Sequence, residues 1–160
     1  MTLRVGVWVT VSILAVLHFL LHIGIGAGRW APDLLTVALL LGVREVRMGP
    51  AATLGLAFGL LEDVFSLLSF GANAVAMAVV GAVGSRTRDF FVGDSLLFLL
   101  CYLGMGKWFR DTLHWLAEGE GVRGNAFQIL VLDGVPQAGY VAVIGVAAFL
   151  VSGAWRETIR

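Results

Sequence analysis

The chain has 160 residues, of which 59% are hydrophobic and 14% are charged, and its 11 basic and 11 acidic side chains give zero net charge. A typical soluble domain is about 45–50% apolar and about 25% charged, so this composition exceeds what one soluble core can bury and predicts a membrane-embedded chain. The lack of a basic excess argues against nucleic acid as a partner. The single cysteine, Cys101, excludes an intramolecular disulfide and a cysteine-based zinc site.

Six apolar stretches follow one another along the sequence. The first begins at Val5 and is longer than the roughly 7–15 apolar residues of a signal peptide, so we expect a retained span. The second and fourth are short for a hydrocarbon core of about 30 Å, so we expect Arg44 and Arg86 to snorkel at their ends. The sequence thus predicts an all-α, six-helix polytopic membrane bundle forming one domain over 1–160, with spans at about 5–27, 32–46, 49–69, 71–85, 94–117 and 127–152.

Basic residues predict the orientation of this bundle. If all six stretches cross and the N-terminus is cytoplasmic, only Arg29 and Arg123 fall in outer loops, while Lys107 and Arg110 lie within the fifth span. An excess of Lys and Arg marks the cytoplasmic side of membrane proteins. We therefore expect a multi-pass protein of the bacterial inner membrane with both termini cytoplasmic. Its inner segments then hold seven arginines: Arg4, Arg44, Arg47, Arg86, Arg88, Arg156 and Arg160.

A pair of glycines four residues apart, Gly55 and Gly59, lies in the third stretch. Small residues at this spacing allow another helix to approach closely, which favours association where lipid provides no hydrophobic gain. Packing within the bundle is the more common use of such a pair. Docking of a partner's helix is the alternative.

Polar side chains gather toward the predicted outer side. Charges at membrane depth are costly and usually face the bundle interior in pairs, so we expect them to form an outer polar cluster joining the third, fifth and sixth stretches. A structural ion-pair network and a vestibule that binds a ligand or partner both remain open. The candidates are Glu62 and Asp63, then Lys107, Arg110, Asp111 and His114, and finally Asp133 and Gln137.

The sequence contains no phosphate-binding loop and no nucleophile-elbow motif, so we predict no catalytic residues and no cofactor. His18 and His22, four apart on the first stretch, could bind a metal together with His114, but no second-shell partner accompanies them. We therefore expect these histidines to pack between helices and predict no metal site. A metal-binding membrane enzyme is the least favoured alternative.

Four segments together resemble the rod shape-determining protein family MreD. They are 32–35 (PDLL), 42–45 (GVRE), 55–63 (GLAFGLLED) and 70–73 (FGAN). The family has a proline at the start of the second span and a glycine- and leucine-rich segment ending in an acid at the close of the third. Chain length and six-stretch hydropathy agree as well. The segment from Lys107 to Asp111 carries more charges than the family pattern has. The resemblance is therefore in doubt over the fifth stretch.

The resemblance implies a fold similar to the substrate-binding subunits of energy-coupling-factor transporters. It also implies a non-enzymatic inner-membrane scaffold of the cell-elongation machinery that helps to regulate peptidoglycan synthesis. The implied direct partner is an MreC-like single-span protein, with MreB filaments, RodA and its penicillin-binding partner as indirect ones. The fold likeness also supplies the alternative function, a subunit that binds a vitamin-like small molecule or a small membrane transporter.

Overall fold

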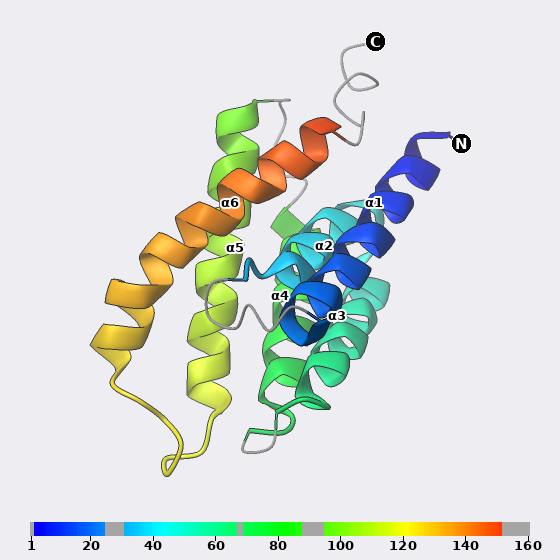
Figure 1. Ribbon diagram of the computed structural model, residues 1–160. Coiled ribbons are helices and arrows are strands. Elements are labelled where there is room, and N and C mark those ends of the chain that lie inside the picture. Colours follow the sequence, from blue (N-terminus) through cyan, green and yellow to red (C-terminus); the bar gives the residue numbers. More distant parts are fainter. Residues whose placement is uncertain (1, 25–30, 67–68, 88–94, 152–160) are drawn as a thin grey trace.

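The computed structural model describes residues 2–24, 31–66, 69–87 and 95–151. All regular secondary structure in these ranges is helical, which confirms the predicted all-α class (Figure 1). Six α-helices follow in order: α1 (Thr2–Phe19), α2 (Leu34–Gly42), α3 (Met48–Asp63), α4 (Ala72–Thr87), α5 (Leu96–Ala117) and α6 (Gly134–Val151). A π-helical segment, Leu20–Gly24, continues α1, another, Gln128–Asp133, precedes α6, and a 3₁₀ turn, Val43–Glu45, follows α2.

The helix bounds differ from the predicted spans mainly in α3. The third span was predicted to reach 69, but α3 ends at Asp63 and the chain turns through Val64 and Phe65. The mostly apolar sequence of 64–68 gives no sign of this end. The second span was predicted over 32–46, whereas α2 itself has only nine residues. The predicted ends at 27, 94 and 152 and both chain termini lie outside the described residues.

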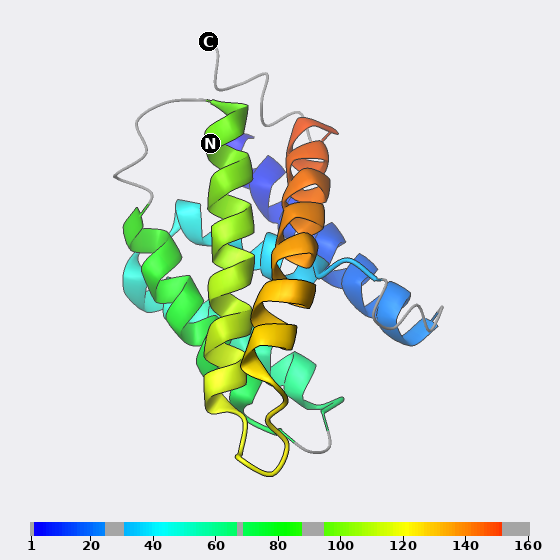
Figure 2. The same ribbon diagram turned by 90° about the vertical axis from the view of Figure 1, so that its left-hand side faces the viewer.

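The short helix α2 forms the centre of the bundle. All nine of its residues are buried, and it contacts α1, α3, α4, α5 and α6 (Figures 1 and 2). Its sequence, LLTVALLLG, is apolar on every side, which is typical of a helix surrounded by others. The one polar side chain, Thr36, donates its hydroxyl to Asp33 at 2.7 Å. Asp33 therefore lies at the N-terminal end of the central helix.

Glycines allow α3 and α4 to pack with their backbones in contact. A Cβ atom added to Gly59 would lie 2.5 Å from the Cα of Ala74, and one added to Gly55 would lie 2.6 Å from the carbonyl carbon of Met77. Such distances leave no room for any side chain at these positions. The structure thus places the glycine pair against a helix of the same chain.

The outer surface of the bundle is strongly apolar. Side chains such as Val5, Ile13 and Leu97 are 60–70% exposed, and similar residues cover the outward faces of the other outer helices. In the described part of the chain, two helical stretches, Val5–His22 and Gln128–Val151, are long and apolar enough to cross a membrane by length and composition. The first residues of α1 and the last residues of α6 lie at the same end of the bundle in both views (Figures 1 and 2).

Candidate functional site

Three charged side chains on one face of α5 form the centre of a buried network. Lys107 and Arg110 are 4% and 7% exposed, which is unusual for cations because burying an unpaired charge is very costly. Lys107 pairs with Asp111 one helical turn away, and the Arg110 guanidinium lies 3.2 Å from the same carboxylate. The structure thus brings together three of the α5 residues that were predicted to join the polar cluster.

The network reaches α2 through Asp33. This residue caps α2, accepting from the backbone N–H of Thr36 at 3.0 Å. Its carboxylate also lies 3.4 Å from the Lys107 Nζ and 3.9 Å from the Arg110 Nη1. Asp33 stood out in the sequence only as part of a family-like segment, so it was not predicted to join the cluster. The signal that could have found it is an aspartate three residues before a threonine at the start of an apolar run, a pattern typical of a helix cap.

The network reaches α3 and α4 through the guanidinium of Arg110. Its Nη2 donates to Glu62 at 2.6 Å and also to the side-chain oxygen of Asn73, a buried residue of α4. Charge-assisted contacts of this kind are stronger than neutral hydrogen bonds. The Nε of Arg110 is buried without a hydrogen-bond partner among the described residues. Asn73 was not among the predicted site residues, although it follows the Gly71 turn that the family-like segment contains.

Asp63 has a different environment from that of its neighbour Glu62. It is fully buried and accepts hydrogen bonds from the backbone N–H groups of Gly71, Asn73 and Ala74 at 2.9, 3.1 and 2.9 Å. These donors belong to the first turn of α4 and the residue before it, so the carboxylate caps that helix. In the described structure Asp63 makes no ion pair with the network. Its role there is to fix the α3–α4 connection.

The histidines lie beside the network. His18 is 3% exposed, and its Nδ1 accepts from the backbone N–H of Leu35 at 3.3 Å, while its ring stacks on His22. His18 therefore joins α1 to the central helix. His114, one turn beyond Arg110 on α5, has its Nδ1 3.9 Å from the carboxylate of Glu118.

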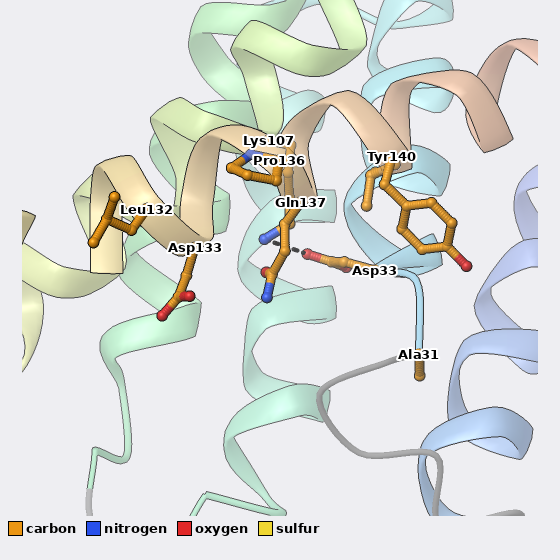
Figure 3. Close-up of a pocket in the computed structure, with 9 residues that line it drawn as sticks. Ala31, Asp33, Lys107, Leu132, Asp133, Pro136, Gln137 and Tyr140 are labelled. Atoms are coloured by element: carbon orange, nitrogen blue, oxygen red, sulfur yellow. Dashed lines mark ion pairs between the residues drawn. The ribbon is translucent and has the colours of Figure 1, made fainter. Parts of the chain in front are cut away.

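A cavity of about 740 Å³ opens beside the network, between the start of α2, α5 and the beginning of α6. Asp33 and Lys107 line it from one side (Figure 3). The other side is lined by Asp133, the last residue of the π-helical segment, and by Gln137 and Tyr140 in the first two turns of α6, spaced four and three residues apart. The two predicted cluster residues of the sixth stretch, Asp133 and Gln137, thus border this cavity.

The arrangement holds charges in fixed positions and joins four helices through one side-chain network. Three carboxylates, on Asp33, Glu62 and Asp111, meet two cations, Lys107 and Arg110. Removing Arg110 would leave Glu62 without its partner, and each further pair joins two of these helices or stabilises α5, so the network fixes how α2, α3, α4 and α5 are packed. No protein-family model, curated protein or solved structure matches the chain.

Proposed function

We propose that the chain is a polytopic protein of the bacterial cytoplasmic membrane that acts as a non-enzymatic scaffold of the MreD type. The observation that carries the proposal is the inverted distribution of polarity. Lys107 and Arg110 are buried, whereas large apolar side chains cover the outer helix faces. Soluble proteins rarely expose apolar patches of this extent, and charged groups of membrane proteins usually pair in the bundle interior.

The path of the chain supports an even number of crossings. The start of α1 and the end of α6 lie at one end of the bundle (Figure 2). The α3–α4 and α5–α6 connections lie at the other end (Figure 1). With the seven arginines of the predicted inner segments, this arrangement favours both termini in the cytoplasm.

The scaffold function rests on the family resemblance and on the structural use of its segments. Asp33 and Glu62 join the charge network, Gly59 allows α3 and α4 to touch, and Asp63 caps α4. These contacts hold the helices of the bundle in fixed positions. Its outer apolar faces are then available to the membrane-spanning helices of partner proteins. The proposed direct partner is an MreC-like single-span protein, and through it MreB filaments, RodA and its penicillin-binding partner.

Co-purification tests this proposal directly. A tagged form of the chain would be co-expressed with the MreC-like protein of its own host and purified from solubilised membranes. We expect the two proteins to be recovered in a constant ratio. An unrelated single-span protein expressed at the same level serves as the control. Recovery of the MreC-like protein at the level of that control would contradict the scaffold function.

A further inference from the structure

The cavity beside the network has features of a binding site that the scaffold function does not use. Its volume of about 740 Å³ is in the range of small-molecule sites, which measure roughly 300–1,000 Å³. Apolar walls formed by Leu132, Pro136 and Val141 surround a few polar groups that converge on the same space. This combination is the usual composition of a ligand pocket.

Polar side chains in the first two turns of α6 point to a polar occupant. Gln137 and Tyr140 border the same cavity as the Lys107–Asp33 pair (Figure 3). Within the described part of the chain, neither the Gln137 amide nor the Tyr140 hydroxyl has a hydrogen-bond partner. Side chains of this kind are unfavourable against lipid. They are expected to meet either water or a polar ligand in the cavity.

The charges around the cavity determine the sign of that ligand. Among the described residues, the network joined by ion pairs contains three carboxylates and two cations, so one negative charge is in excess when His18 and His114 are neutral. Lys107 is already held by two carboxylates, Asp33 and Asp111, and therefore has little attraction left for an anion. Asp33 has the longest ion pairs of the three acids, at 3.4 and 3.9 Å, and it is the one that borders the cavity.

Tyr140 supplies a second element that favours a cation. Its side chain is 52% exposed and borders the same cavity as Asp33. The face of an aromatic ring attracts ammonium groups through its quadrupole, and this attraction strengthens when water is excluded. We propose that the cavity between α2, α5 and α6 binds a small organic cation, an alkylammonium group, between the Asp33 carboxylate and the Tyr140 ring.

The test uses n-butylammonium chloride as the probe on the full-length chain purified in a nonionic detergent. We expect a saturable rise of the thermal unfolding midpoint, because a ligand that binds only the folded state stabilises it. Sodium chloride at equal ionic strength and sodium butyrate, which carries the opposite charge, are expected to give no saturable rise. The absence of saturation with butylammonium, or an equal response to butyrate, would overturn the proposal.

Two variants of the cavity wall assign the binding to this site without disturbing the network. Tyr140→Leu removes the ring and is expected to weaken apparent butylammonium affinity by roughly two- to thirtyfold, from about 0.5–2 kcal/mol for a cation–π contact. Tyr140→Phe keeps the ring and is the matched control, expected to bind like the parent. Equal affinities of the parent and Tyr140→Leu would overturn the assignment to this cavity.

The ammonium group could come from a free amine or from a lipid headgroup, and a competition experiment separates the two sources. The titration is repeated in nanodiscs of phosphatidylethanolamine and in nanodiscs of phosphatidylglycerol, which lacks an amine. Weaker butylammonium binding in the former identifies the lipid headgroup as the source. Equal binding in both identifies a free amine. Because none of these measurements involves a protein partner, their failure would leave the scaffold function standing, and the reverse also holds.

Discussion

Asp63, the last residue of α3, accepts a hydrogen bond from the backbone N–H of Ala74 in the first turn of α4, at 2.9 Å. The residue before α4 is Gly71, which has a φ of +95° and no side chain that could accept from the backbone N–H groups of the first turn. Asp63 supplies the cap from the preceding helix. The acid that closes the family-like segment therefore has a clear structural use.

Replacing Asp63 tests this cap. In Asp63→Ala the donors of Gly71, Asn73 and Ala74 lose their acceptor in a buried position, at a cost of about 1–3 kcal/mol for each group that stays unpaired. We expect a clearly lower thermal unfolding midpoint in detergent. Asp63→Asn keeps one acceptor oxygen and should give an intermediate value. Glu120→Ala, which removes an exposed acid, is the control. An unchanged midpoint for Asp63→Ala would show that the cap contributes little.

The close approach of α3 and α4 predicts a large difference between two Gly→Ala substitutions. A Cβ at Gly59 would meet the backbone of Ala74, whereas one at Gly139, in α6, would meet no atom within 4 Å. Overpacking typically costs about 1–3 kcal/mol, and alanine is favoured over glycine in a helix by about 1 kcal/mol. Gly59→Ala should therefore lower the free energy of unfolding and Gly139→Ala should leave it unchanged or raise it. Equal effects of the two substitutions on the unfolding midpoint would contradict the packing described here.

The pair formed by Arg110 and Glu62 predicts non-additive effects. Arg110→Met leaves the partly buried Glu62 carboxylate without its partner at 2.6 Å, and because breaking a fully buried pair costs about 3–5 kcal/mol, we expect a smaller loss here. Glu62→Gln in the same chain removes the orphaned charge, so the double variant should be more stable than Arg110→Met alone. A double-mutant cycle on the unfolding free energy measures this coupling. Additive effects would indicate that the two side chains do not interact in the membrane.

Trp108 donates a hydrogen bond from α5 to the segment before α6. Its loss is expected to destabilise the fold less than the loss of the Asp63 cap or of the Arg110–Glu62 pair. Its Nε1 donates to the carbonyl oxygen of Leu130, in the π-helical segment before α6, at 2.9 Å. Trp108→Phe keeps most of the ring but loses this bond, which is worth about 0.5–1.5 kcal/mol. We expect a modest decrease of the unfolding midpoint and faster hydrogen exchange over 128–133. Unaltered exchange in that segment would show that the bond does not restrain it.

Much of the fold follows from sequence patterns, because long apolar runs identify helices. The all-α class was predicted and is confirmed. The span predicted over 49–69 extends past the end of α3 at Asp63, because apolar residues continue beyond that point, whereas the hydrogen bonds of Asp63 to α4 have no sequence signature. The short length of α2 was recognised from the sequence. Its position at the centre of the bundle depends on how the other helices surround it.

The site was predictable where it depended on one helix and missed where it depended on several. Lys107 and Asp111 are four residues apart, and this spacing alone predicts that they share a helix face. Asp33 and Asn73 come from the start of α2 and from α4, and no local pattern links either residue to α5. Asp63 was expected to join the cluster with Glu62 because the two are neighbours in the sequence. The structure separates them, because adjacent residues on a helix point in directions about 100° apart.

Depletion of the protein in a rod-shaped host tests the scaffold function most directly. Cell width and the level of the MreC-like protein would be followed by microscopy and immunoblotting as the protein declines. The account predicts rounding of the cells together with loss of the MreC-like protein. Cells that keep their rod shape and their normal MreC-like level, and instead require a vitamin for growth, would contradict it.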